Sequence, residues 1–272
     1  MIAIIAGKGR LPIYACQSLL FKQKSFFVIV LFPADNFEQL QVTVGSQIKL
    51  ISQPFYKVGS ILQTLKENFT RQILFIGKVD KQHLLSHVKF DWLAIKLLTS
   101  MLYKNDSAIM EYLIQELAKH SIEVISQADV LDALIVPPGV LSGNMTPELE
   151  HSISMGINTA IKLSECDIGQ TVIVKDNMII AVEAIEGTDN CIKRGIELGK
   201  NNIVICKAAR SNQNKKFDLP ALGPHALENL QLGQVAAVAW LSSQTLIADQ
   251  DDFIKKAQSL KITLVSYAPN SK

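Results

Sequence analysis

The sequence predicts an α/β protein of two domains, a Rossmann-like domain with a parallel sheet followed by a mixed α/β domain. In the first half, short runs rich in β-branched residues alternate with segments whose apolar residues recur at helical spacing. The chain of 272 residues is also longer than a usual single domain. A stretch rich in proline and glycine interrupts the pattern. We therefore expect domains at 1–135 and 148–272, joined by a linker at 136–147.

The first domain contains five runs with the length and composition of strands. They read IAIIA, FFVIVLF, IKLIS, QILFIG and IEVIS, and helical patterns lie at 11–22, 58–69 and 108–120. This alternation favours a parallel sheet with helices on its faces. In such sheets, ligands bind outside the carboxyl ends of the strands.

The second domain is expected to begin with a helix that runs to about residue 165. Thr146 is a suitable N-cap, Pro147 suits the first helical position, and two glutamates follow in the first turn. A hairpin comes next, because Asp176 and Asn177 join two β runs and tolerate the positive φ of a tight turn. Beyond it we expect a helix, the strand NIVICKA, a helix after 223, the strands QVAAVAW and TLIAD, and a final helix and strand.

Composition and charge exclude several classes of protein. The chain is 48% hydrophobic and 19% charged, which suits a globular protein rather than a disordered one. Its net charge of +2, without a stripe of Lys and Arg between aromatic residues, argues against a nucleic-acid partner. The N-terminus lacks the features of a signal peptide, and no apolar run is long enough to span a membrane.

The four cysteines are far apart in the sequence and show no CxxC spacing. This pattern is typical of reduced thiols in a core rather than of zinc ligands or disulfides, and it favours a cytoplasmic protein. The cysteines are Cys16, Cys166, Cys191 and Cys206.

The stretch AGKGRLP places Gly7 and Gly9 between the first strand and the first helix, with Pro12 in the first helical turn. Glycine lets a backbone approach a phosphate, and a helix N-terminus offers N–H donors to it. The third glycine of a dinucleotide fingerprint is absent, and no GK[ST] follows. A ligand-binding loop and a plain tight turn therefore both remain open.

Two further clusters are better explained without a metal. His83 and His87 have the spacing of a zinc pair but no third ligand nearby in the sequence, so solvated or capping histidines are favoured. In ADQDDF, 248–253, the acids precede and enter a predicted helix, where they complement its dipole.

Two acidic turns remain. EGTD, 186–189, follows the second strand of the hairpin where a helix begins, and such a turn can present N–H groups to a phosphate beside a carboxylate that holds a cation. Gly187 and Thr188 can equally serve as a permissive residue and a helix cap. Asp218, in KFDLPALG, lies in a predicted loop, where an aspartate is often a local cap. Function and capping stay open for both turns.

Together these motifs resemble the LpxI-type UDP-2,3-diacylglucosamine diphosphatases of Gram-negative lipid A synthesis. The resemblance covers essentially the whole chain. It is carried by IAGKGRLP, LFIGKV, DIGQTVIV, AVEAIEGTD and DLPALG, of which the last three are specific to the family in order and spacing.

The resemblance implies a nucleotide-binding-like first domain and a catalytic second domain that hydrolyses the pyrophosphate of a UDP-linked diacylated sugar. Water would attack the phosphorus next to the sugar, with a divalent cation such as Mg²⁺, releasing UMP and the lipid monosaccharide 1-phosphate. The implied catalytic residues are Asp218, Asp189 and Glu186, with Asp218 and Asp189 as metal ligands. The implied substrate-binding residues are Gly7, Gly9, Leu11, Pro12, Gly77, Lys78, Thr188, Lys207, Arg210 and Gln213.

The chain departs from the family pattern before DLP. There the family reads close to KPxQDxR, whereas residues 210–216 read RSNQNKK. Gln213 is retained, Ser211 replaces the proline, and Lys216 stands at the basic position, where it lacks the bidentate fork of arginine. Ala221 stands where the family commonly has threonine.

The expected partner is a lipid-linked UDP-sugar enclosed between the domains. The expected location is cytoplasmic, with peripheral attachment to the inner membrane, and a homodimer is left open. An NAD(P)-dependent oxidoreductase that uses the first domain is one alternative. The incomplete glycine fingerprint argues against it, as does the lack of an obvious acid at the end of the second strand other than Asp35. A non-catalytic protein that binds nucleotide-sugars or lipid is the second, and binding without turnover would distinguish it.

Overall fold

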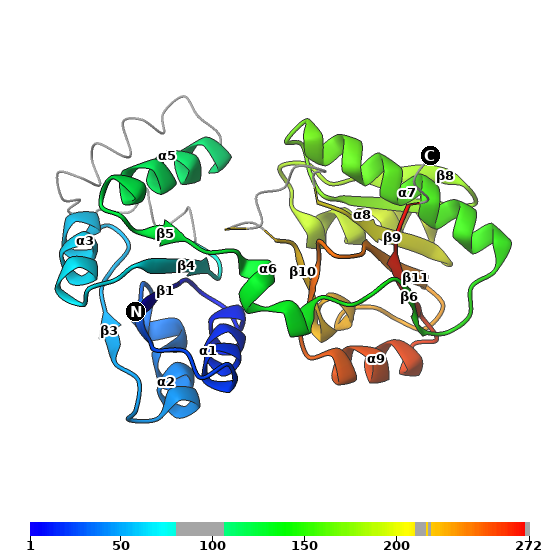
Figure 1. The fold of residues 1–272 in the computed structure, drawn as a ribbon. Coiled ribbons are helices and arrows are strands. Elements are labelled where there is room, and N and C mark those ends of the chain that lie inside the picture. Colours follow the sequence, from blue (N-terminus) through cyan, green and yellow to red (C-terminus); the bar gives the residue numbers. More distant parts are fainter. Residues whose placement is uncertain (80–105, 210–215, 217–218, 270–272) are drawn as a thin grey trace. The chain divides into compact units, whose positions relative to one another are not determined.

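A computed structural model describes residues 1–79, 106–209, 216 and 219–269 of the chain (Figure 1). The chain divides into two compact units, Met1–Leu131 and Asp132–Lys272. The first unit contains a parallel sheet and the second a mixed one, as the sequence predicted. His83 and His87 lie outside the described residues.

The first unit is built on a parallel sheet with the strand order β3-β2-β1-β4-β5. Strands β1 and β2 are buried along their whole length, which accounts for their continuous apolar sequences. The bounds are β1 (Ile2–Ala6), β2 (Phe26–Val30), β3 (Leu50–Ser52), β4 (Gln72–Ile76) and β5 (Glu123–Val124).

Helices cover both faces of this sheet, as Figure 1 shows. Ala3 and Ile5 of β1 pack in one cluster with Leu65 of α3 and Leu117 of α5, so the opposite face of β1 is left to α1 and α2. The sequence reasoning missed α2. The bounds are α1 (Leu11–Phe21), α2 (Pro33–Val44), α3 (Val58–Glu67), α5 (Asp106–Lys119) and the short α6 (Gln127–Val130).

The second unit is built on a mixed sheet with the strand order β6-β13-β11-β9-β7-β8. Strands β9, β11 and β13 are parallel, while β7 is antiparallel to both β9 and β8. The carboxyl ends of β8, β9, β11 and β13 therefore lie at the same edge of the sheet. The bounds are β6 (Gly139–Ser142), β7 (Thr171–Lys175), β8 (Met178–Val182), β9 (Ile203–Lys207), β11 (Val235–Leu241) and β13 (Thr263–Tyr267).

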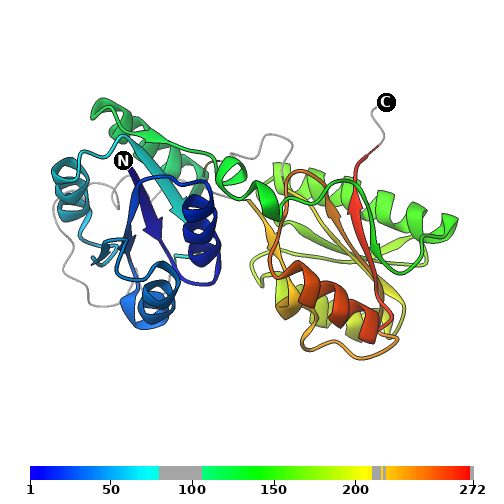
Figure 2. The ribbon, with the colours of Figure 1, turned by 60° about the horizontal axis from the view of Figure 1, so that its bottom comes forward.

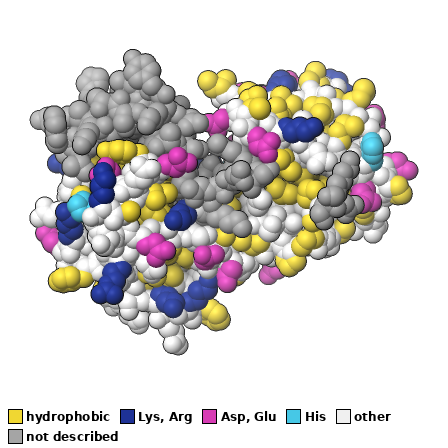
Figure 3. Space-filling model, turned by 45° about the horizontal axis from the view of Figure 1, so that its top comes forward, with side chains coloured by type: hydrophobic (Ala, Val, Ile, Leu, Met, Phe, Trp, Pro, Cys, Tyr) yellow, Lys and Arg dark blue, Asp and Glu magenta, His cyan; other side chains and the backbone are white. Residues whose placement is uncertain are grey.

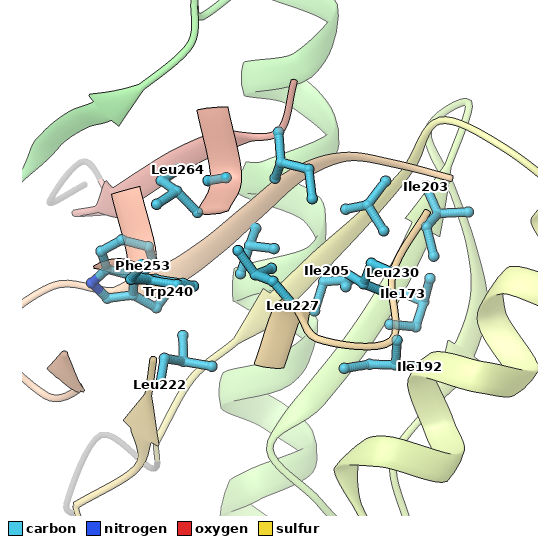
Figure 4. Packing of buried hydrophobic residues seen from close by; sticks show 14 of the residues in the cluster. Ile173, Ile192, Ile203, Ile205, Leu222, Leu227, Leu230, Trp240, Phe253 and Leu264 are labelled. Atoms are coloured by element: carbon cyan, nitrogen blue, oxygen red, sulfur yellow. The ribbon is translucent and has the colours of Figure 1, made fainter. Parts of the chain in front are cut away.

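Two hydrophobic layers enclose this sheet. Helix α7 (Pro147–Glu165) packs on one face, and α8 (Thr188–Gly199) and α9 (Gln250–Ser259) pack on the other (Figure 2). In Figure 4, Ile192 of α8 lies against Ile173, and Phe253 of α9 lies beside Trp240, with their ring centroids 6.1 Å apart. The strands carry buried apolar side chains on both faces, so each helix layer packs on a hydrophobic surface.

Several local predictions are confirmed. Thr146 caps α7, since its hydroxyl accepts a hydrogen bond from the Leu149 N–H at 3.2 Å. Asp176 and Asn177 adopt φ of 47° and 59° in the hairpin turn. All four cysteines are free thiols, but Cys166 is exposed, so the predicted core position is wrong for that residue.

Three other local predictions are corrected. The stretch expected to be a linker contains β6, which pairs antiparallel with β13 as an edge strand, where preceding prolines are tolerated. The helix expected after 223 is a single 3-10 turn, η3 (Pro224–Leu227). The run TLIAD supplies β12 (Leu246–Ile247), which pairs with β10 (Ala221–Leu222) in a separate small sheet.

Charges of both signs lie on the face of the described residues drawn in Figure 3. On the face in Figure 3, Lys and Arg side chains alternate with Asp and Glu, and hydrophobic side chains are scattered among them. Within the part of the chain that the structure describes, no helix is both long and apolar enough to cross a membrane.

Candidate functional site

The predicted glycine loop lies at the carboxyl edge of the first sheet, where β1 and β4 are neighbours. The Gly7 N–H donates to the Ile76 carbonyl at 2.8 Å, and the backbones of Lys8 and Lys78 exchange hydrogen bonds of 2.7 and 2.9 Å. A Cβ at Gly7 would lie 2.5 Å from the Lys78 carbonyl oxygen, and one at Gly77 would lie 2.8 Å from that of Lys8. Gly77 also has φ of 92°. Both glycines are therefore required by the packing of one loop on the other.

The rest of this edge is more open. Gly9 has φ of 93° and open space where a Cβ would point, and α1 begins at Leu11 with Pro12 buried in its first turn. Lys78, whose backbone bonds that of Lys8, is exposed at the same edge. The structure thus gathers the six substrate-binding residues predicted in the first unit at one edge of the sheet.

Asp35 does not have the position expected of a ribose-binding acid. It lies in the first turn of α2 rather than at the end of β2, and its carboxylate is 3.3 Å from the Lys8 ammonium, which also lies 5.0 Å from the ring centroid of Phe32. Asn36, buried next to it, donates to the Gly7 carbonyl at 2.8 Å. These contacts tie α2 to the glycine loop, so the geometry gives the oxidoreductase alternative no support.

In the second unit, the EGTD turn meets the end of β9 at the first turn of α8. Gly187 is the N-cap of α8 but provides no side-chain cap. The Thr188 hydroxyl donates to the Glu183 carboxylate at 2.9 Å and accepts from the Lys207 ammonium at 3.1 Å. The capping role considered for Thr188 is therefore wrong, because its hydroxyl joins an acid to a cation instead.

Lys207 ends β9 and is only 9% exposed. Its neighbours in register are Thr171 on β7 and Trp240 on β11, both buried. Residues in register point to the same face of a sheet. The Thr171 Oγ1 and Trp240 Nε1 atoms have no hydrogen-bond partner in the described structure. Lys207 therefore lies in a polar row across three strands, on the face that α8 covers.

Glu186 has a different environment from the one predicted for a catalytic acid. Its carboxylate forms an ion pair with Arg194 and accepts from the Ala184 N–H at 3.1 Å, while Arg194 also donates to the Val182 carbonyl at 2.9 Å. The hydrogen bond from Arg194 holds the pKa of the Glu186 carboxyl below its ordinary value. The basic residue after EGTD thus anchors the turn to β8.

The sequence reasoning missed Glu183. This residue lies in the AVEAIEGTD motif, directly after the apolar run of β8, and that position was the available signal. Burial raises the pKa of the nearby Cys191 thiol to about 11, and the charges that act on this thiol are those of Arg194, Glu183, Glu186 and Lys207. Glu183 and Lys207 thus meet through Thr188, the first residue of α8.

A cation site is not complete within the described residues. Across 1–79, 106–209, 216 and 219–269, no group of three or more His, Cys, Asp and Glu side chains is placed to hold a metal ion. Asp189 is exposed in the first turn of α8. Asp251 and Asp252 lie in the first turn of α9, after Asp249 as N-cap, as expected of acids that complement a helix dipole.

Three predicted site residues, Arg210, Gln213 and Asp218, lie outside the described residues. The flanks of their segment are described. Ala208 follows Lys207 and donates from its N–H to the Gln170 carbonyl at 2.9 Å. At the other flank, the Pro220 carbonyl accepts from the Leu246 N–H at 2.8 Å. The described chain therefore leaves β9 after Lys207 and is described again up to β10 from Leu219 on.

Comparison with known families matches both units. The LpxI N-terminal domain matches residues 1–134, and the LpxI C-terminal domain matches residues 137–265. The chain belongs to the LpxI family. One relative, the UDP-2,3-diacylglucosamine pyrophosphatase LpxI of Caulobacter vibrioides, is 24% identical over 289 aligned residues, which cover 100% of this chain and 99% of the relative.

Membership of the LpxI family confirms the resemblance read from the motifs. In this LpxI chain, IAGKGRLP and LFIGKV meet through Gly7 and Gly77 in the first unit. In the second unit, DIGQTVIV and AVEAIEGTD meet through Thr171 and Glu183. The first contact joins motifs that are far apart in the sequence, and the second joins the two strands of one hairpin.

Proposed function

We propose that this chain is a hydrolase that splits UDP-2,3-diacylglucosamine into UMP and 2,3-diacylglucosamine 1-phosphate in lipid A biosynthesis. One observation carries the proposal: Lys207, the last residue of β9, and Thr188 meet at the N-terminus of α8. The name of the Caulobacter vibrioides relative supports the identity of the substrate.

The second unit offers a diphosphate the groups that it requires. The N-terminus of α8 presents backbone N–H groups and the positive end of the helix dipole. Lys207 adds an ammonium group in a largely buried position, where charges interact more strongly than in water. These groups suit the charge that develops on phosphoryl oxygens during hydrolysis.

The acids of the reaction are proposed to be Asp218 and Asp189. Asp218 accepts a proton from water, whose oxygen forms a bond to the phosphorus next to the sugar. The bond from this phosphorus to the bridging oxygen breaks, and the bridging oxygen leaves with UMP. Glu186, already paired with Arg194, is proposed to hold the turn rather than to act on the substrate.

Magnesium is proposed as the cation. Mg²⁺ is usually held by one or two carboxylates together with substrate phosphate oxygens and water, so a complete protein cage is not required. Asp189 and Asp218 are the carboxylates proposed to provide oxygen donors of this kind. A bound Mg²⁺ would neutralise charge on the diphosphate.

The open edge of the first unit is proposed to contribute to substrate binding through Gly9, Leu11 and Lys78. Gly7 and Gly77 would act indirectly, because their backbones are already committed to each other. The acyl chains of the substrate favour a bilayer, so we also propose that the enzyme works peripherally at the cytoplasmic face of the inner membrane.

The direct test supplies UDP-2,3-diacylglucosamine with magnesium and measures UMP. We expect release of UMP that depends on the divalent cation. Binding of the substrate without turnover at any magnesium concentration would instead support the non-catalytic alternative. A nicotinamide absorbance in the purified protein would support the oxidoreductase.

A further inference from the structure

The DIGQT part of the DIGQTVIV motif has no role in the reaction proposed above, yet it holds one acid firmly. The Glu183 N–H donates to the Thr171 carbonyl at 2.8 Å, and the Gln170 N–H donates to the Glu183 carboxylate at 3.3 Å. A Cβ at Gly169 would lie 2.1 Å from the Glu183 carbonyl oxygen. Only glycine at 169 therefore lets the chain pack this closely against Glu183.

The second oxygen of this carboxylate faces the site. Glu183 Oε1 accepts the hydroxyl proton of Thr188 at 2.9 Å. A threonine hydroxyl has one proton to donate and two lone pairs. Because the proton is directed to Glu183, a lone pair is available to Lys207, whose ammonium donates at 3.1 Å.

The arrangement also places a negative charge near a buried positive one. Lys207 is almost removed from solvent, and a buried ammonium is stable only with hydrogen-bonding or charged partners. Glu183 provides its charge through one hydroxyl rather than by direct contact. The hydrogen bond to Thr188 thus fixes one direction of the ammonium, and its positive charge suits an anion at the first turn of α8.

We propose that Glu183 is a positioning residue of the diphosphate hydrolysis, which acts through the Thr188 hydroxyl to hold the Lys207 ammonium at the first turn of α8. The inference rests on the proposed function. Glu183 itself does not touch the substrate. The DIGQT stretch holds this acid in place. Gly169 lets the chain pack closely against Glu183, and the Gln170 N–H donates to the Glu183 carboxylate.

The test compares kcat and KM of Glu183→Gln with those of Glu197→Gln, an exposed acid later on α8 that serves as the matched control. We expect Glu183→Gln to lower kcat by about 10- to 100-fold, the loss typical when a partner that orients a functional group is removed. KM should stay within about twofold, because the uridine, sugar and acyl chains supply most ground-state affinity. Glu197→Gln should leave both constants within about twofold of wild type.

Thr188 variants test whether Glu183 acts through the hydroxyl. Thr188→Ser keeps the hydroxyl and should retain kcat within about threefold, whereas Thr188→Val should lose about as much as Glu183→Gln. Adding Glu183→Gln to Thr188→Val should lower kcat by no more than about twofold further. Thermal unfolding checks that each variant is folded, and the two Thr188 variants decide the question if Glu183→Gln is unstable.

The outcomes separate this inference from the proposed function. No release of UMP by the wild-type protein overturns the function and, with it, any role of Glu183 in that reaction. Release by wild type together with an unchanged kcat in Glu183→Gln overturns the inference alone. Multiplicative losses in the double variant, or a raised KM at unchanged kcat, also overturn it.

Discussion

Glu183 and Glu186 are three residues apart, yet they bind different partners. Glu183 directly follows β8 and accepts a hydrogen bond from the Thr188 hydroxyl, whereas Glu186 forms an ion pair with Arg194 farther along α8. The sequence motif alone does not distinguish the two acids. Their roles diverge because the chain turns between them. The Glu183 carboxylate bonds Thr188 and the Gln170 N–H, whereas the Glu186 carboxylate bonds Arg194 and the Ala184 N–H.

At the residue scale, we predict that Asp218→Ala lowers kcat far more than it weakens substrate binding. Loss of a general base costs about 10²–10⁴-fold in rate. KM should change by no more than about threefold, because the carboxylate acts mainly in the transition state. Steady-state kinetics at saturating magnesium and mass spectrometry for retained substrate provide the measurement.

Asp252→Ala is the control for Asp218→Ala. Asp252 is exposed in the first turn of α9, 3.7 Å from the Lys255 ammonium, and it has no proposed role in the reaction. The kcat of Asp252→Ala should match that of the wild-type protein. Near-normal turnover by a folded Asp218→Ala variant would remove this residue from the mechanism.

At the scale of elements, the turn between β8 and α8 depends on an ion pair whose strength varies with pH. Because Arg194 lowers the pKa of Glu186 in the folded protein, the pair stabilises the fold above the ordinary carboxyl pKa of about 4.3. This contribution is lost as the pH falls through the lower, folded pKa.

We therefore predict that Glu186→Gln lowers the thermal unfolding midpoint at neutral pH, and that the difference from wild type shrinks as the pH falls below about 4.3. Calorimetry of both proteins across this range provides the test, with Glu197→Gln as a control that should follow wild type throughout. An equal difference at every pH would show that the charge of Glu186 is not the cause.

The elements that could be predicted from the sequence are those with strong periodicity or a clear cap. The buried runs of β1 and β2 and the capped helix α7 belong to this group. Helix α2 was missed because it begins inside PADNF, a polar segment with few apolar residues, and its buried contacts come from Asn36, Leu40 and Val44. Strand β6 follows prolines that read as a linker, and pairing with β13 decides its structure.

The site could be predicted only in part, for a related reason. EGTD was singled out because a strand end, a glycine, a hydroxyl and a carboxylate coincide where a helix begins, and Lys207 was named through the family resemblance. The bond from Thr188 to Glu183 could not be found in this way, since it depends on how far α8 rotates on the sheet. That rotation is set by contacts such as Ile192 with the core of the second unit.

At the scale of the whole molecule, each unit has a hydrophobic core of its own, and the proposed binding and catalytic residues are divided between the units. The groups proposed to act in catalysis belong to the second unit, where Lys207 and Asp189 lie. Water should therefore attack only one of the two phosphorus atoms of the substrate, the one that lies beside these groups.

We predict that hydrolysis in ¹⁸O-labelled water places the label in the lipid monosaccharide phosphate. Water attacks the phosphorus next to the sugar in the proposed reaction, so the new oxygen stays with that phosphorus. Mass spectrometry of both products decides the point, with a non-enzymatic incubation to correct for exchange. Label in UMP would reject attack at the sugar-side phosphorus.

The contact between Gly7 and Gly77 has a consequence for how the gene can change. Each position is closed to larger residues by the main chain of the other loop, and a further side-chain substitution cannot move a main chain out of the way. The two codons are therefore under one shared restraint, although they are far apart in the gene. Natural variation in the LpxI family should preserve glycine at both positions together, and a lineage that escapes at one of them should have rebuilt both loops.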